Sequence, residues 1–180
     1  ALATAPFEHR GQVTDEYIEV VKRITAGGVV HFDGQHYQLA GVHAQPAALQ
    51  RPHIPVLIGG VTARALSRVA RHADGWLSVS LRAAQLAPKL AQLRALWREA
   101  GKAEQDLMLV HKVFISLGEA RRGLDGERSP GTGSLTEVID DLRRIRALGY
   151  QHLIVRYIGE RLEDQTTQLA RFVDEVIPQV

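Results

Sequence analysis

The stretch Val56-Leu57-Ile58-Gly59-Gly60-Val61-Thr62 is a short apolar run that ends at two glycines and a hydroxyl residue. This pattern predicts a β-strand that stops at a tight turn and leads into a helix capped by Thr62. The first backbone N–H groups of such a helix have no partner within the helix, and the partial positive charge there attracts phosphate. The stretch therefore predicts a bound phosphorylated cofactor.

From Val56 onward, apolar strand patterns alternate with helical patterns. The predicted pairs are strand 56–58 with helix 62–73, strand 75–79 with helix 82–100, strand 108–117 with a helix from the capping box Ser134/Glu137, and strand 152–158 with helix 162–176. Four βα units in sequence predict a parallel sheet with right-handed crossovers. They fit either an open doubly wound sheet or half of an eight-stranded barrel.

The first 55 residues follow a different pattern. Thr14 is the predicted N-cap of a helix with Tyr17, Val21 and Ile24 on its apolar face, which ends at Gly27-Gly28. Residues 29–39 predict a hairpin around a type I′ turn at Asp33-Gly34, and the proline-rich residues 41–55 predict a loop. We therefore interpret residues 1–180 as a single domain, with a helix, hairpin and loop (1–55) before four βα units (56–180).

Composition excludes several classes of function. The 180 residues are 45% hydrophobic, enough for one core, and the net charge of +2 comes with arginines spread along the chain, which argues against nucleic-acid binding. The chain has no cysteine, no apolar run of membrane-spanning length and no signal-peptide pattern, so we expect a soluble cytoplasmic protein without membrane contact. The eight histidines lack metal-ligand spacing, and no metal site is predicted. Gly131-Thr132-Gly133 lacks the lysine of a P-loop and predicts a flexible approach to the capped helix.

Several motifs in order decide between the two architectures. Pro55 to Gly60 together with Ala73-Asp74-Gly75-Trp76 resembles the signature of the luciferase-like monooxygenase superfamily. The upstream stretches 6–11, 14–17, 32–37 and 46–55 are similar to its flavin- or coenzyme F420-dependent branch. No single motif is specific, but together they span nearly the whole chain.

The resemblance implies an α/β fold of the TIM-barrel type, in which this chain forms the C-terminal half of a (β/α)8 barrel with a hairpin insertion before its first βα unit. The family's first four strands, which supply most contacts to the cofactor ring, have no counterpart in this sequence. A half-barrel exposes two sheet edges and an apolar interior. We therefore expect a homo-oligomer, or the missing N-terminal half-barrel, to complete the structure.

The resemblance also implies cofactor-binding residues. Ile58, Gly59 and Gly60 bring backbone to the cofactor phosphate, and Thr62 adds its hydroxyl; the simpler interpretation is a tight turn and an N-cap, and both can hold together. A second group has an alternative role for each member. Ser78, Ser80 and Arg82 face the cofactor or belong to a solvated loop, and Arg156 and Lys112 face the ligand or pair with a carboxylate between the layers. Two further residues have structural roles, Asp74 as a cap or turn residue and Trp76 as a core residue.

The resulting hypothesis is a luciferase-like oxidoreductase or monooxygenase unit that acts on a small-molecule substrate, without assignable catalytic residues. Its cofactor is coenzyme F420, with FMN as the alternative, used for hydride transfer or oxygen activation. The competing interpretation is a non-catalytic half-barrel that serves assembly or is a fragment without the ring-binding half. A third interpretation is an open-sheet protein that binds a sugar phosphate or a nucleotide, but the usual sequence motifs of such proteins are absent.

Overall fold

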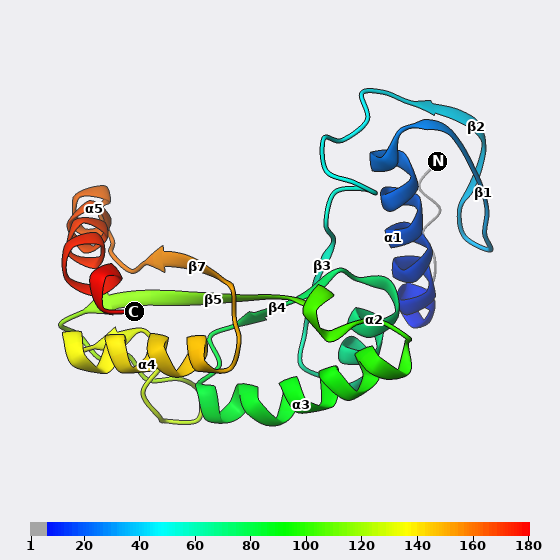
Figure 1. Ribbon diagram of the computed structural model, residues 1–180. Helices are drawn as coiled ribbons and strands as arrows, with labels where there is room; N and C mark the ends of the chain where they lie inside the picture. The colour runs from blue at the N-terminus through cyan, green and yellow to red at the C-terminus, as the bar shows by residue number, and fades with distance from the viewer. Residues whose placement is uncertain (1–6) are drawn as a thin grey trace.

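The computed structural model describes residues 7–180, so Pro6, the first residue of one family-like motif, lies outside the described residues. Two lobes follow each other along the chain (Figure 1). The first contains a 3-10 turn (Phe7–His9), α1 (Arg10–Ala26), β1 (Gly28–Asp33) and β2 (Gln38–Ala44). The second contains β3 (Leu57–Gly59), α2 (Ala63–His72), β4 (Gly75–Val79), α3 (Ala83–Glu99), a 3-10 turn (Glu104–Asp106), β5 (Met108–Leu117), β6 (Thr132–Gly133), α4 (Leu135–Ala147), β7 (His152–Tyr157), α5 (Leu162–Arg171), a π-helical segment (Phe172–Val176) and a final 3-10 turn (Ile177–Gln179).

The main sheet has the strand order β3-β4-β5-β7, with every pair parallel. The two-residue strand β6 pairs with Ser116 and Leu117 at the end of β5, beyond the ladder between β4 and β5. Helices α2, α3 and α4 lie along one side of this sheet (Figure 1). The predicted parallel sheet of four βα units is therefore confirmed, and the extra strand β6 was not predicted.

The two faces of the sheet differ because side chains alternate along each strand. The face toward the helices carries Trp76 and Ser78 of β4 and Leu109, His111 and Val113 of β5, all of them buried. The opposite face, which we call the open face, carries the alternate residues of each strand. They include Leu57 and Gly59 of β3, Leu77 and Val79 of β4, Lys112 and Phe114 of β5, and Ile154 and Arg156 of β7, none of which is buried. Gly75 of β4 and Val110 and Ser116 of β5 lie on the same face and are buried.

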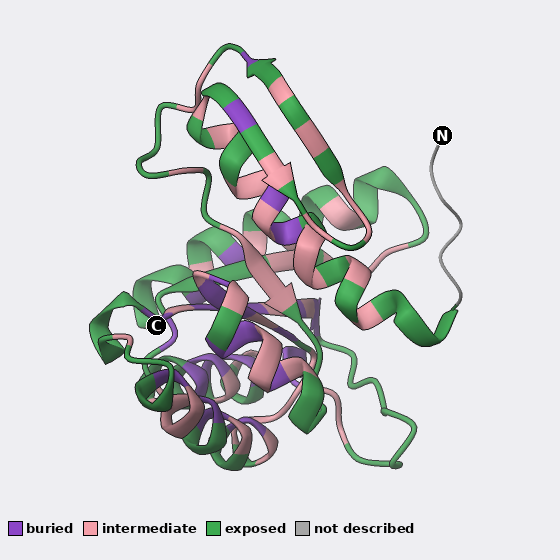
Figure 2. Ribbon diagram, turned by 90° about the vertical axis from the view of Figure 1, so that its right-hand side faces the viewer, coloured by how far each residue is buried: buried purple, intermediate pink, exposed green. Residues whose placement is uncertain are grey.

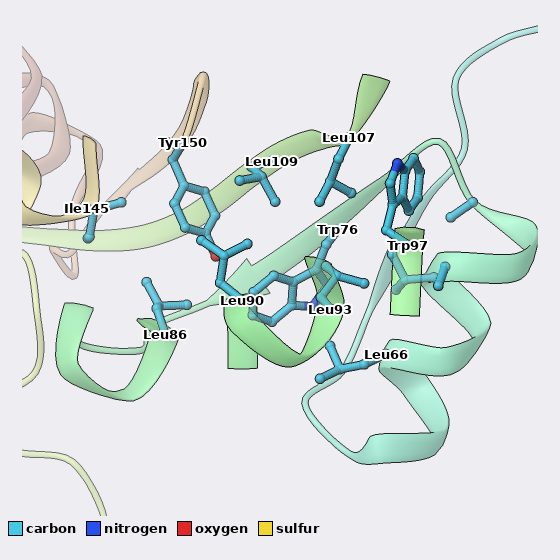
Figure 3. Close-up of a cluster of buried hydrophobic side chains, with 13 residues drawn as sticks. Leu66, Trp76, Leu86, Leu90, Leu93, Trp97, Leu107, Leu109, Ile145 and Tyr150 are labelled. Carbon is cyan, nitrogen blue, oxygen red and sulfur yellow. The ribbon is translucent and has the colours of Figure 1, made fainter. Parts of the chain in front are cut away.

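Two apolar clusters hold the helices to the sheet. The first joins α2, α3 and β4 around Trp76 and Trp97, both almost fully buried, and includes Leu66, Leu86, Leu90 and Leu93 (Figure 3). The second joins β5, α4 and the segment Phe172–Val176 through Val113, Ile115, Val138 and Leu142. The prediction that Trp76 is a core residue is confirmed.

Helix α1 begins earlier than predicted. It starts at Arg10, so Thr14 lies inside the helix, where its hydroxyl donates to the carbonyl of Arg10 at 2.7 Å and caps nothing. The predicted apolar face is also wrong, since Tyr17 and Ile24 are exposed whereas Ile18 and Val20 are buried. The helix is held to the second lobe by ion pairs, which apolar periodicity does not report. These pairs are Asp15 with Arg68 and Lys22 with Asp74, and the carboxylate of Glu19 also lies 3.6 Å from the imidazole of His72.

The predicted hairpin exists, but its turn differs. Asp33 pairs with Gln38, which leaves a four-residue loop, Gly34 to Tyr37, in place of a two-residue Asp-Gly turn. The carboxylate of Glu16 on α1 accepts the backbone N–H groups of Gln35, His36 and Tyr37 at 2.8–3.0 Å and so stabilises the wider loop. Strand β2 also continues to Ala44, into the residues predicted as loop. This lobe has few buried residues (Figure 2).

The segment before α4 is anchored and is not a flexible approach. Thr132 and Gly133 form β6, and Asp141 of α4 binds the guanidinium of Arg128 through both carboxylate oxygens at 2.8 and 2.9 Å. Asp141 also accepts the backbone N–H of Gly131 at 2.9 Å. The predicted capping box of α4 is confirmed, because Ser134 and Glu137 exchange side-chain and backbone hydrogen bonds.

Within residues 7–180, no helix combines the length and the apolar character that a membrane span requires.

Candidate functional site

The turn between β3 and α2 lies at the carboxyl end of the sheet and requires glycine at one position. Gly60 has φ +105°, and a Cβ built there would lie 2.8 Å from the Cβ of Ala65. Gly59 has no positive φ, and a Cβ there would make only ordinary contact, 3.5 Å from the carbonyl oxygen of Leu77. Only Gly60 is therefore fixed by conformation, because other residues rarely adopt this backbone geometry.

The turn presents hydrogen-bond donors and positive charge. The Thr62 hydroxyl oxygen accepts the N–H of Ala65 at 3.2 Å, which confirms Thr62 as the N-cap of α2. The N–H groups of Ala63 and Arg64, at the first helical positions, have no partner within the helix. The first turn of α2 contains no acidic residue, and the ammonium group of Lys89 on α3 donates to the carbonyl of Val61 at 3.2 Å. Lys89 was not predicted, because it approaches the turn from the next helix and no local sequence pattern indicates this contact.

Two residues, Trp76 and Ile58, connect the turn to the core on the helix side of the sheet. The indole N–H of Trp76 donates to the carbonyl of Gly60 at 2.9 Å, which ties the turn to the first apolar cluster. Ile58 packs against the same cluster, so its side chain faces the helices and only its backbone borders the turn. At the opposite end of the strand pair, the carboxylate of Asp74 accepts the N–H of Val56 at 2.7 Å, so the prediction of a structural cap there is confirmed.

Ser78 does not lie on the surface at the carboxyl end of β4. It is buried on the helix side, where its hydroxyl lies 2.7 Å from His111 Nδ1 and 3.0 Å from the hydroxyl of Tyr150. Burial lowers the pKa of His111 to about 4 and raises the pKa of Tyr150 to about 12. Both groups are therefore neutral at pH 7, and Nε2 of His111 has no hydrogen-bond partner among residues 7–180.

This buried histidine predicts a pH dependence of stability. His111 has an ordinary pKa of 6.5 when unfolded and about 4 when folded, so its contribution is complete above pH 6.5 and is lost as the pH falls toward 4. We expect the free energy of unfolding of the wild type to fall, between pH 7 and 4.5, by about 2 kcal/mol more than that of His111→Asn, which does not titrate. Urea unfolding at both pH values measures this difference. Parallel pH profiles for the two proteins would contradict it.

Ser80 and Arg82 lie after β4, as predicted, and they differ in their hydrogen bonding. Ser80 has φ +51°, and its hydroxyl is buried without a hydrogen-bond partner in the part of the chain that the structure describes. Arg82 binds Asp125 of the loop after β5 at 2.6 Å, and this guanidinium lowers the pKa of the Asp125 carboxyl. Arg82 is therefore engaged in a contact between loops.

Arg156 lies on the open face near the end of β7 and is exposed. Lys112 of β5 shares this face, and neither side chain forms an ion pair with a carboxylate in residues 7–180. The alternative that either pairs with a carboxylate between the layers is therefore wrong for the described residues. The same residues contain no group of three or more His, Cys, Asp or Glu side chains that could hold a metal ion.

Comparison with known proteins shows which family this sequence belongs to. Residues 2–127 match the sequence pattern of the luciferase-like monooxygenase family. The chain belongs to this family. An uncharacterized protein of Mycobacterium tuberculosis is 39% identical over 179 residues, which are 99% of this chain and 57% of that protein. The chain thus spans little more than half the length of this relative.

Solved structures show the same relation at the level of the fold. The coenzyme F420-dependent tetrahydromethanopterin reductase of Methanopyrus kandleri superposes with a TM-score of 0.77 at 14% identity, over 93% of this chain and 63% of that one. A riboflavin lyase with modified FMN superposes with a TM-score of 0.71 at 12% identity, over 97% of this chain and 57% of that one. The luciferase-like chain therefore has the fold of half a TIM barrel, with its open face on the side of the barrel interior.

Proposed function

We propose that this luciferase-like chain is an oxidoreductase unit that binds the phosphate end of a flavin-type cofactor at the turn from Gly59 to Thr62. The observation that carries the proposal is Gly60, whose positive φ and contact with Ala65 exclude a side chain where a capped helix begins. Such a turn lets a phosphate approach backbone N–H groups closely. The ammonium group of Lys89, 3.2 Å from the carbonyl of Val61, adds charge of the required sign.

Each protein group has a defined part in this proposal. The N–H groups at the start of α2 and the ammonium of Lys89 bind the phosphate. The Thr62 hydroxyl, whose oxygen already accepts the N–H of Ala65, donates a hydrogen bond to the phosphate. Trp76 holds the turn in place through the carbonyl of Gly60. When bound, the cofactor supplies hydride transfer or oxygen activation. Ser78 is left out because its hydroxyl is buried on the helix side of the sheet.

Coenzyme F420 is the proposed cofactor, with FMN as the alternative. The sequence resembles the F420-dependent branch, and the Methanopyrus kandleri reductase with a similar fold is F420-dependent. The riboflavin lyase with modified FMN has a similar fold too. A phosphate is common to both cofactors, so the turn does not distinguish them.

A fluorescence titration with each cofactor tests this proposal. We expect saturable binding of F420 with a dissociation constant roughly in the micromolar range, and weaker binding of FMN. The variant Lys89→Gln should bind about tenfold less tightly, because it loses the cation beside the turn. Lys102→Gln is the control, because Lys102 lies beyond the C-terminal end of α3 and its ammonium donates to the carbonyl of Ala73. If neither cofactor binds to an assembled sample, the proposal fails.

A second proposal concerns assembly. In residues 7–180, strands β3 and β7 each pair with a single strand, and the open face carries the partly exposed apolar residues Val79 and Ile154. Free edges and an apolar face favour association. We propose that a complementary half-barrel, from the missing N-terminal half or a second copy, covers them. A non-catalytic assembly domain is the alternative function that this feature favours. Sedimentation velocity at micromolar concentration should show an oligomer, and a single monomeric species would exclude self-assembly.

A further inference from the structure

Two cations flank one aromatic ring on the open face. The ammonium of Lys112 lies 5.6 Å and the guanidinium carbon of Arg156 lies 5.8 Å from the centre of the Phe114 ring. Phe114 and Arg156 are register partners on neighbouring strands, and Lys112 precedes Phe114 by two residues on the same face. The three side chains therefore form one group, which we call the cationic platform.

The charge of the cationic platform is not neutralised by the described residues. Neither cation has a carboxylate within 4.0 Å among residues 7–180, whereas Arg128 pairs with Asp141 and Arg82 pairs with Asp125. The open face becomes the interior when a barrel closes, and an unpaired charge buried there is strongly destabilising. Two such charges side by side favour the binding of an anion.

The cationic platform is separate from the phosphate-binding turn. Gly59 lies on β3, at one edge of the sheet, whereas Arg156 lies on β7, at the other edge. Three strand spacings of ~4.8 Å separate them, or ~14 Å. Both lie toward the carboxyl ends of their strands, where barrel enzymes bind their ligands. One phosphate cannot occupy both places.

We propose that Lys112 and Arg156 bind the carboxylate or phosphate group of an anionic substrate, with the ring of Phe114 against its apolar part. This inference rests on the proposed function, because it assigns the substrate class of the same barrel mouth. A guanidinium binds either oxyanion through two parallel hydrogen bonds, and the lysine adds a mobile point charge. The resulting enzyme uses an organic acid or a phosphate ester in place of a neutral substrate.

Binding of simple anions tests the inference without measuring activity. Benzoate and inorganic phosphate are titrated separately by calorimetry into the protein saturated with F420, at low ionic strength. We expect saturable binding of at least one, and the tighter of the two identifies the oxyanion. Arg156→Gln and Lys112→Gln should each weaken it by about tenfold. Arg71→Gln is the control, because the side chain of Arg71 on α2 donates to the carbonyl of Ser67 within its own helix, and it should leave binding within about twofold.

The outcomes separate this inference from the proposed function. Cofactor affinity should be unchanged in Arg156→Gln and Lys112→Gln, since the turn at Gly60 lies at the other edge of the sheet. Thermal unfolding checks that both variants fold. No saturable anion binding to a protein that binds F420 would overturn the inference alone, as would equal binding by the wild type and both variants. Competition between the anion and F420 would also overturn it, because it would place the cofactor on the platform.

Discussion

Replacing Trp76 with alanine is expected to lower the free energy of unfolding by about 3–5 kcal/mol. The side chain is fully buried in the first apolar cluster, so the change removes a large apolar volume that its neighbours on α2 and α3 cannot refill. It also leaves the carbonyl of Gly60 without its indole partner. Urea unfolding followed by circular dichroism measures the loss.

Trp76→Phe separates packing from the hydrogen bond. It keeps an aromatic ring in the core but removes the donor to Gly60, so we expect a smaller stability loss, of about 1–2 kcal/mol, together with weaker cofactor binding. Trp97→Phe is the matched control, because the Trp97 indole donates to a carbonyl at the same distance, 2.9 Å, but that carbonyl belongs to Ala103. Equal losses of F420 affinity in the two variants would show that Trp76 has no special link to the turn.

Replacing Gly60 with alanine is expected to reduce both stability and cofactor binding. The new Cβ would lie 2.8 Å from that of Ala65, at a backbone φ of +105° that alanine rarely adopts. The strain should cost about 1–3 kcal/mol, and relief of that strain should move the N–H groups at the start of α2. We expect F420 affinity to fall by at least about tenfold, measured by fluorescence titration.

Gly59→Ala is the comparison at the neighbouring position. Its Cβ would find only the carbonyl of Leu77 at 3.5 Å, and its φ is not positive, so stability should stay within about 0.5 kcal/mol of the wild type. The pair therefore distinguishes a conformational requirement from the mere presence of a methyl group. Similar stability losses in both variants would contradict the geometry described for the turn.

The regular part of the fold was predictable because its signals are local. Strands 75–79 and 108–117 were placed with their observed bounds, and the helix signals at Thr62 and Ser134 correspond to real caps. These features depend on side-chain periodicity and on capping chemistry within three residues. The family resemblance then selected the half-barrel over the open sheet, which periodicity alone did not.

The errors lie where distant residues override local preference. The four-residue hairpin loop depends on Glu16, which is about twenty residues away in sequence. The strand β6 depends on pairing with the end of β5. The position of Lys89 beside Val61 depends on how α3 packs against α2. None of these contacts has a signature within a short window of sequence.

The orientation of Ser78 could have been found. Side chains two residues apart share one face of a strand, so the prediction of a core position for Trp76 already implied that Ser78 faces the helices. The same alternation places Lys112 beside Phe114, and Arg156 opposite to its neighbours Val155 and Tyr157. Applied to every strand, the alternation identifies the residues of the open face.

A crystal structure of the protein with F420 bound tests the central claim most directly, because it locates the phosphorus atom. We predict that the phosphate oxygens lie within hydrogen-bond distance of the backbone N–H groups at the start of α2 and of the Thr62 hydroxyl, with the Lys89 ammonium nearby. A phosphate held at the cationic platform of Lys112 and Arg156, or at the start of α4 near Ser134, would contradict the assignment of the Gly59–Thr62 turn.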